Sequence, residues 1–158
     1  MTDPDSLYRE LRPEIEELSE PLFSASQVLV RKRGAFLPHG AMRTTSGDVQ
    51  LIMATPDNLD QDVVSSSEML PNLHEALRQA AREQASAVAV CEDVRITQEG
   101  QKETRAIKVL IEHRRGFCVA LYLPFRRKLF GYSFGDIFVI PANPEVNAWP
   151  QTGNASSE

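Results

Sequence analysis

Cysteines and long apolar runs are scarce in this chain of 158 residues. Two cysteines are too few for a disulfide framework or a cysteine-lined metal cage. No apolar run approaches the roughly 20 residues that a membrane-spanning helix needs. The first eleven residues are acidic and polar, so we do not expect a secretory signal peptide. These absences predict a cytoplasmic protein. Phosphate-binding loops of the Walker or G-x-G-x-x-G type are also absent, so the sequence gives no motif for nucleotide binding.

Negative charge is in excess, and the excess lies at one end of the chain. The net charge is −5, from 17 bases and 22 acids. Residues 1–20 hold seven acids and two bases, so the rest of the chain is neutral. A solvated helix face explains this segment most simply, and a docking arm for a basic partner is the alternative. A neutral body argues against nucleic acid binding, which needs a concentrated basic excess.

The first 33 residues predict helix. Apolar residues follow Asp3-Pro4 at helical spacing: Leu7, Leu11, Ile15 and Leu18. Pro13 is expected to kink or split this helix, and Pro21 to end it or open the next. Residues 22–33 are assigned to helix because three cations precede Gly34, a residue that suits the left-handed cap.

Strands alternate with one further helix in the remaining chain. Residues 35–54 predict a hairpin with its turn at residues 44–47, and an amphipathic helix follows up to residue 84. Three strands come next, at residues 87–97, 105–113 and 117–123, and an apolar closing segment spans residues 129–140. Residues 141–158 are expected to be a loosely ordered tail, with Trp149 packed back on the body. We therefore predict one domain, residues 1–140, that includes the acidic helical segment 1–20.

Side-chain parity fixes the register of the last two strands of the meander. A three-residue loop at residues 114–116 sets Ile111 opposite Val119 and puts all the large aliphatic residues on one face. It also puts Gly116 where such loops need a left-handed residue. In this register the two cysteines are roughly 9–10 Å or more apart, so we expect both to be reduced.

The order of the elements resembles that of profilin-like and roadblock-like domains. This resemblance implies an α+β fold with a five-stranded, mostly antiparallel sheet of order 2-1-5-4-3 and helices packed on it. Separately, residues 34–41 (GAFLPHGA) and 123–127 (LPFRR) resemble a family of small uncharacterised bacterial proteins. That resemblance implies a shared fold over roughly residues 22 to 138, and it implies no activity.

One motif suggests catalysis. Residues 131–135, Gly-Tyr-Ser-Phe-Gly, fit the G-x-S-x-G turn that presents a serine nucleophile in α/β-hydrolases. In that fold the histidine follows the serine, whereas all three histidines of this chain precede Ser133. The strand–helix alternation of a parallel sheet is missing as well. We therefore expect a glycine-containing strand turn and retain a small serine hydrolase as a remote alternative.

Two isolated side chains are candidates for a pocket. The histidines lie 35 and 39 residues apart with no H-x-x-x-H pair, which argues against a metal site. His39, between Pro38 and Gly40 on an irregular strand, can line a pocket. Glu92 falls on the apolar face of its strand. A bulge at residues 92–93 that turns it outward is favoured over a partly buried carboxylate.

Basic clusters are the remaining candidates for binding. Arg126, Arg127 and Lys128 can hold a phosphate, a carboxylate or an acidic partner strand, although surface charge is the simpler interpretation. We predict a non-catalytic protein-interaction or regulatory module that binds a protein partner or a second copy of itself. The alternative is a sensor of a small anionic ligand, with its pocket around His39 and residues 124–128. No nucleic acid, membrane, metal or cofactor is expected.

Overall fold

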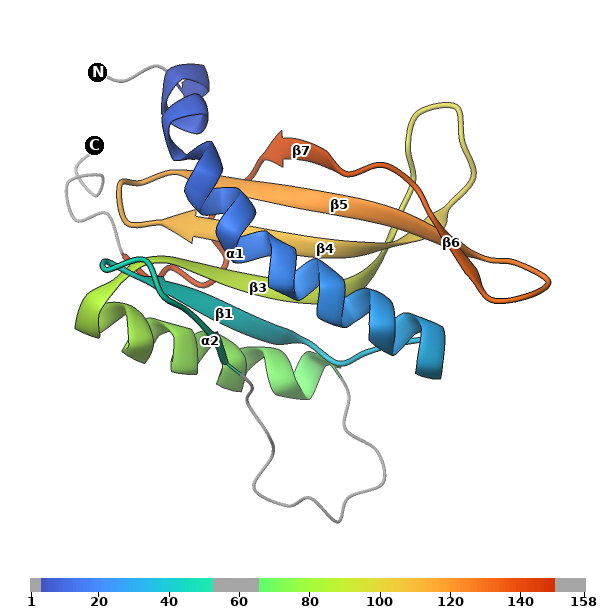
Figure 1. Ribbon diagram of the computed structural model, residues 1–158, viewed down its shortest axis with the longest axis horizontal. Coiled ribbons are helices and arrows are strands. Elements are labelled where there is room, and N and C mark those ends of the chain that lie inside the picture. The colour runs from blue at the N-terminus through green and yellow to red at the C-terminus, as the bar shows by residue number, and fades with distance from the viewer. Residues whose placement is uncertain (1–3, 53–65, 150–158) are drawn as a thin grey trace, which may run out of the picture.

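The computed structural model describes residues 4–52 and 66–149. An antiparallel sheet with one helix on each face makes up this part of the chain (Figure 1). The elements are α1 (Pro4–Arg33), β1 (His39–Thr44), β2 (Val49–Ile52), α2 (Ser66–Gln84), β3 (Ala85–Ile96), β4 (Thr104–His113), β5 (Cys118–Arg127), β6 (Tyr132–Phe134) and β7 (Phe138–Pro141). The predicted α+β class with an antiparallel sheet and packed helices is confirmed.

The strand order differs from the prediction. The sheet has seven strands and runs β2-β1-β3-β4-β5-β6, with β7 also paired to β5. The predicted five strands in the order 2-1-5-4-3 are wrong, because β1 pairs β3 and not the last meander strand. β5 lies on the far side of the sheet, where β7 and β6 pair with successive parts of it.

Pro124 and the apolar composition of β3 agree with this order. The N–H and C=O of one antiparallel strand residue point to the same neighbour. The Pro124 C=O accepts the Gly135 N–H at 2.8 Å, so the donor that proline lacks faces the β6–β7 side. If β5 lay beside β1, the missing N–H of Pro124 would face β1 in the middle of the sheet. β3, in contrast, has buried apolar side chains on both faces, as a strand between two helices requires.

The two helices build separate cores on the two faces of the sheet. The core under α1 contains Ile107, Val109 and Ile111 of β4 and the facing residues of β5. The core under α2 contains Leu73 and Leu77. Gly40 lets both β3 and α2 come close to β1, because a Cβ there would lie 2.6 Å from the carbonyl oxygen of Ala89 in β3 and 3.3 Å from Leu77 Cδ1 in α2.

α1 is one helix and is not split at either proline. Pro13 and Pro21 lie inside its 30 residues, and Figure 1 shows the first turns of α1 at an angle to the remainder. An internal proline costs about 3 kcal/mol or more. Ile15, Leu18 and Leu22 are almost fully buried, at about 1.5–3 kcal/mol each, and so keep the chain helical. The predicted end is confirmed: the helix stops at Arg33, and the Gly34 N–H donates to Val30 C=O at 2.8 Å.

The meander register is confirmed. Ile111 lies opposite Val119, and the loop at residues 114–116 has Gly116 at a φ of 88°. Both cysteines are free, as predicted. The bulge expected at residues 92–93 is wrong, because β3 pairs β4 without interruption from Ala87 to Ile96.

Residues 145–149 return to the face of the sheet that α2 covers. The buried Glu112 carboxylate accepts the backbone N–H groups of Glu145, Val146 and Ala148, at 2.6–3.1 Å. Val146 and Ala148 are buried, and Trp149 packs against the same core. The described part of the segment predicted to be a loose tail, up to Trp149, thus lies on the body of the protein.

Candidate functional site

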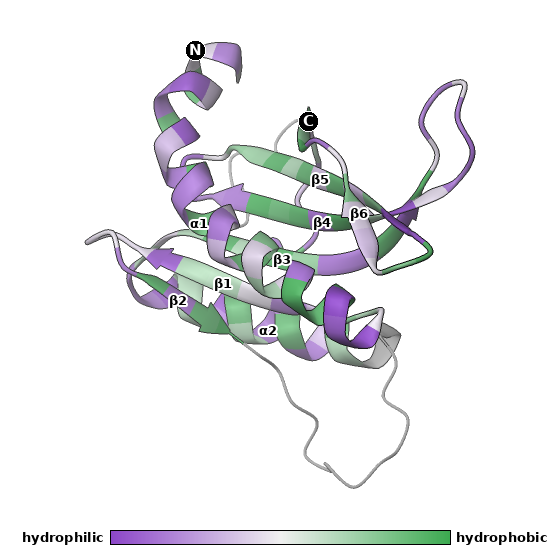
Figure 2. Cartoon of the chain, turned by 45° about the vertical axis from the view of Figure 1, so that its right-hand side comes forward, coloured by the Kyte–Doolittle hydropathy of each residue, from purple (hydrophilic) through white to green (hydrophobic). Residues whose placement is uncertain are grey.

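The turn between β5 and β6 presents two large apolar side chains to solvent. Leu129 and Phe130 are each 91% exposed, and Figure 2 shows this hydrophobic tip beyond the end of the sheet. The Lys128 N–H donates to Gly131 C=O at 2.8 Å, and Gly131 has a φ of 84°. The backbone of this turn, residues 128–131, is therefore well defined, and we call it the hairpin finger. Turns usually carry small or polar residues, so an exposed Leu-Phe pair here requires an explanation.

A basic groove of about 580 Å³ lies next to the finger. It is formed where the end of β3, the loop after it, the start of β4 and the end of β5 meet. Its lining residues are Arg95, Gln101, Lys102, Glu103, Thr104, Arg105, Phe125, Arg126 and Arg127. The structure thus brings Arg126 and Arg127, but not His39, into a shared concave site.

Arg105 holds the floor of the groove in place. Its guanidinium donates to Asp93 at 2.6 Å and to the Gly34 carbonyl at 2.7 Å, and lies 4.6 Å from the centre of the Phe125 ring. The Gly34 contact ties the C-terminal end of α1 to the sheet. Arg31 of the same helix end lies 4.9 Å from the centre of the Phe134 ring of β6. Two helix-to-sheet contacts therefore support the base of the hairpin finger.

Positive charge accumulates at this end of the molecule. We define the basic end as residues 31–36, 93–105 and 124–136, which hold nine bases and four acids, a net charge of +5. Since the whole chain carries −5, the remainder carries −10. Within the described residues, seven exposed cations of this end form no ion pair: Arg31, Lys32, Arg33, Lys102, Arg126, Arg127 and Lys128. They are available to an anionic partner.

The cations of this site are recognisable in the sequence, whereas its apolar tip was not predicted. The sequence predicts an apolar closing segment at residues 129–140 with a glycine-containing turn within residues 131–135. The turn falls at Gly131, which places Leu129 and Phe130 in the turn and not in a strand. An apolar pair between three cations and a glycine was the signal that could have identified it.

His39 lies elsewhere, beneath α1, and is only 5% exposed. Its Nδ1–H donates to Leu37 C=O at 3.1 Å, so Nε2 accepts the Ser26 hydroxyl, 3.4 Å away. The Ser26 oxygen lies 3.1 Å from Cys91 Sγ, and burial raises the pKa of this thiol to about 12. Burial lowers the pKa of His39. The register places His39 three strands and five residues from Arg126, roughly 20 Å.

Ser133 lies on the short edge strand β6, with an exposed side chain opposite Arg126. None of the described histidines hydrogen-bonds to it. His39 is bonded as above, and His113 bonds to Glu14 and to the Arg115 N–H. The third, His74 of α2, has an Nε2 without a hydrogen-bond partner, and burial lowers its pKa. Among the described residues, no histidine is placed to act as the base for Ser133.

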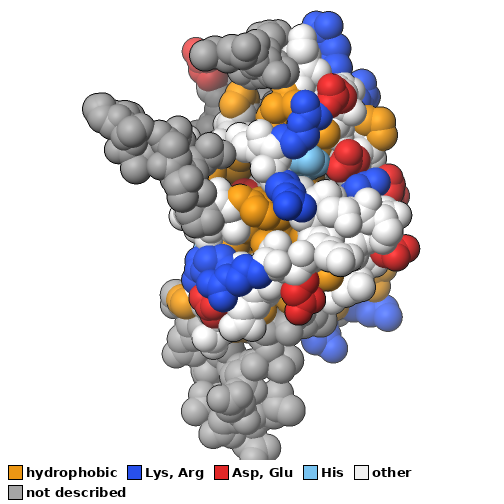
Figure 3. Space-filling model, turned by 90° about the vertical axis from the view of Figure 1, so that its left-hand side faces the viewer, with side chains coloured by type: hydrophobic (Ala, Val, Ile, Leu, Met, Phe, Trp, Pro, Cys, Tyr) orange, Lys and Arg blue, Asp and Glu red, His pale blue; other side chains and the backbone are white. Residues whose placement is uncertain are grey.

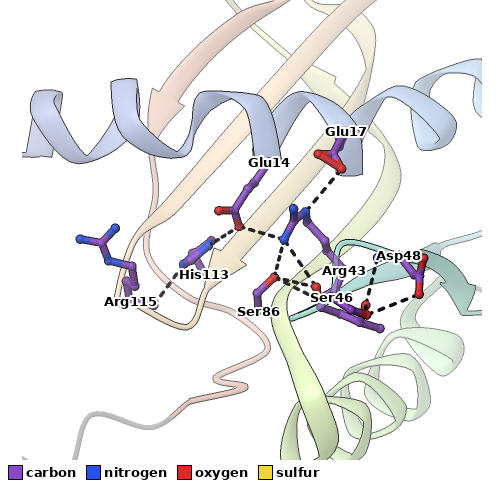
Figure 4. A network of polar contacts seen from close by, with 9 residues as sticks. Glu14, Glu17, Arg43, Ser46, Asp48, Ser86, His113 and Arg115 are labelled. Atoms are coloured by element: carbon purple, nitrogen blue, oxygen red, sulfur yellow. Dashed lines mark hydrogen bonds and ion pairs between the residues drawn. The ribbon is translucent and has the colours of Figure 1, made fainter.

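Glu14 of α1 joins the helix to two strands (Figure 4). Its carboxylate accepts His113 Nε2–H at 2.9 Å and lies 3.4 Å from Arg43 Nη1. Arg43 also donates to the Ser86 hydroxyl at 3.2 Å and lies 3.6 Å from the Glu17 carboxylate. Figure 4 shows these side chains converging from α1, β1, β3 and β4. We call this set the helix clamp, and every charge in it has a partner of opposite sign.

Glu92 is half-buried on the α2 side, which is the less favoured of the two predicted alternatives. It lies opposite Lys108 in the β3–β4 ladder, and Lys108 pairs with Glu145 at 2.9 Å. Burial raises the pKa of Glu92. These groups secure the returning segment, residues 145–149, and do not line the basic groove.

A second groove, of about 790 Å³, lies at the opposite end, between the start of α1 and the strands β5 and β7. Leu7, Tyr8, Phe117 and Ile140 are among its apolar lining, and its charged lining residues are Asp5 and Arg115. Arg115 forms an ion pair with Glu10. On this side of the molecule, basic and acidic side chains both lie around the hydrophobic ones (Figure 3).

No family model, curated protein or solved structure matches this chain. Across residues 4–52 and 66–149, no three metal-ligating side chains cluster in a way that could hold an ion. Neither described helix has the length and apolar character needed to cross a bilayer.

Proposed function

We propose that this protein is a non-catalytic interaction module that binds a protein partner through the hairpin finger. The observation that carries the proposal is the 91% exposure of both Leu129 and Phe130 on a supported turn. Each side chain would contribute about 1.5–3 kcal/mol if a partner buried it fully. Large apolar anchors of this kind dominate the affinity of many interfaces.

The surroundings of the finger support a protein interface. Unpaired cations beside the finger accelerate encounter with a negatively charged partner, and they favour one orientation of approach. The turn is held by a backbone hydrogen bond and by the α1 contacts to β6 and Arg105, so little conformational entropy is lost on binding. The proposal places the protein in the cytoplasm, where two free cysteines remain reduced.

Photo-crosslinking tests the proposal at the level of single residues. We expect a p-benzoylphenylalanine at position 130 to crosslink one protein in cells. The same group at Leu51, which is 55% exposed on β2, should not crosslink that protein. The crosslinked protein is then purified and its affinity measured. We expect Leu129→Ser with Phe130→Ser to weaken binding by at least about tenfold, and Leu51→Ser to leave it unchanged. Equal crosslinking at both positions, or full affinity of the finger variant, would rule the proposal out.

A small anionic ligand is the second candidate, and the basic groove is the observation that favours it. Three groove cations, Lys102, Arg126 and Arg127, are unpaired in the described structure and border about 580 Å³. A thermal-shift screen of phosphates and carboxylates tests this function. We expect a hit to lose its stabilising effect in Arg126→Glu, and a screen without hits would count against a sensor.

A further inference from the structure

We infer that the partner presents an acidic, extended chain segment, and that this segment lies in the basic groove while the hairpin finger enters an apolar pocket of the same partner. This inference rests on the proposed function and adds the chemistry of the partner. The juxtaposition that supports it is a concave cationic site directly beside a convex apolar tip.

The groove has the chemistry of a carboxylate site. Arg95, Arg105, Arg126 and Arg127 supply planar guanidinium groups, which bind carboxylates through two parallel hydrogen bonds. Arg105 is already occupied by Asp93 and the Gly34 carbonyl, and Arg95 lies 3.3 Å from Glu103. The vacant positive charge therefore comes from Lys102, Arg126 and Arg127, enough for a few carboxylates and not for a long polyanion.

The same geometry distinguishes a peptide from other anions. Glu103 and Asp93 are already paired with Arg95 and Arg105, and three vacant cations are too few for the densely spaced phosphates of a nucleic acid. A flat bilayer would meet the finger, but it could not enter a groove between two strand ends. A single phosphate would fill part of the groove and leave Leu129 and Phe130 exposed. A chain segment is the one ligand that extends along the groove and continues into a folded body.

The uneven distribution of charge in this chain also favours an acidic partner. The basic end carries +5, whereas the remainder of the chain carries −10. Such a charge distribution orients the molecule, with the basic end toward a negative surface and the acidic part of α1 away from it. A neutral partner would not benefit from this arrangement.

Fluorescence anisotropy with defined probes tests the inference. The probes are labelled octapeptides of glutamate and of glutamine, a 20-base-pair DNA duplex, and vesicles containing phosphatidylserine. We expect the glutamate peptide to bind and the glutamine peptide not to, with an affinity that falls steeply as salt is raised. Arg126→Glu with Arg127→Glu should weaken glutamate-peptide binding by at least about tenfold. The matched charge reversal Arg82→Glu, on the exposed face of α2, should leave it unchanged.

Each outcome separates this inference from the proposed function. Phe130→Ser is expected to retain glutamate-peptide binding, because the peptide needs the groove and not the finger. A glutamate peptide that binds no better than glutamine, or one that is insensitive to Arg126→Glu with Arg127→Glu, would overturn the inference. Preferential binding of the duplex or the vesicles would overturn it as well. A crosslinked partner whose contact segment is neutral would overturn the acidic segment alone, and the proposed function would stand. Circular dichroism and thermal melting confirm that each variant is folded.

Discussion

The helix clamp and the basic end both contain arginines of the same sheet, but their surroundings are opposite. Arg43 in the clamp is largely buried and faces Glu14, Glu17 and the Ser86 hydroxyl. Arg126 at the basic end is exposed and faces no acid among the described residues. The apolar residues show the same contrast, since Leu22 of α1 is fully buried and Leu129 is 91% exposed.

This contrast distinguishes the side chains that stabilise the fold from those that are available to bind a partner. A charge or an apolar surface that finds its partner within the chain contributes to stability. One that finds none contributes little to stability and is retained for solubility or binding. Substitutions in the helix clamp and the core under α1 should therefore change the free energy of unfolding, whereas substitutions at the basic end should change the affinity for a partner.

The largest effect on stability is expected from leucine truncation. Leu22→Ala removes a fully buried side chain from the core under α1 and should lower the free energy of unfolding by about 2–5 kcal/mol. Leu129→Ala removes the same atoms from solvent and should change it by less than about 0.5 kcal/mol. Urea denaturation of both variants measures the difference. A comparable loss of stability in Leu129→Ala would show that the finger is part of the fold.

Removal of a clamp carboxylate should have the next largest effect. Glu14→Ala leaves His113, which is 5% exposed, and Arg43 without their shared acceptor. We expect a loss of about 1–2 kcal/mol, reduced from the value of a buried charged hydrogen bond because Glu14 is partly exposed. Glu16→Ala removes only an exposed pair with Arg12 and should cost less than about 0.5 kcal/mol. Equal losses in urea denaturation would mean that the clamp does not act as a unit.

The parts of this fold that local patterns determine were predictable, and the parts that depend on distant pairing were not. Parity along the meander gave the register of Ile111 with Val119, because a slip of one residue would turn every side chain to the other face. The continuity of α1 through Pro13 depends on burial against strands that come much later in the chain. The position of β5 was marked in the sequence by Pro124, a residue that marks an edge or a break in a ladder.

The candidate site divides in the same way. Arg126, Arg127 and Lys128 are visible as a charge cluster in the sequence. The pairing of β4 with β5 places Arg126 and Arg127, but not Lys128, in one groove with Lys102 and Arg105. His39 looked like a pocket residue because Pro38 and Gly40 suggest irregular backbone. Gly40 instead permits the close approach of the β3 backbone and of α2, and the imidazole lies under α1. Glycine and proline indicate where the backbone is unusual, but not on which side space is left.

A smaller effect is expected from the geometry of the finger itself. Gly131→Ala puts a Cβ on a residue with a φ of 84°, which costs about 1 kcal/mol in an L-residue. Because the turn at Leu129 and Phe130 would relax, affinity for the crosslinked partner should fall. Gly135→Ala adds a Cβ at an ordinary 3.7 Å from the Pro124 carbonyl and should change neither stability nor affinity. Titration of the partner, with urea denaturation in parallel, distinguishes a loss of turn geometry from a loss of folding.

The fourth expected effect on stability is a dependence on pH in the core under α1. Burial lowers the pKa of His39 in the folded state below its usual value of 6.5, so the unfolded chain binds a proton more readily. The contribution of His39 to stability is therefore complete above pH 6.5 and is lost as the pH falls below that value. In His39→Gln, whose side chain does not titrate, the free energy of unfolding should fall less between pH 7 and pH 5 than in the wild type. Urea denaturation at both pH values measures the difference of slopes, and Arg126→Gln, a change at the exposed basic end, serves as the control with an unchanged slope. If the free energy of unfolding of His39→Gln depended on pH as steeply as that of the wild type, the hydrogen-bonded series Cys91–Ser26–His39 would accept a proton without loss of stability. The contrast between a partnered interior and an unpartnered basic end would then no longer hold.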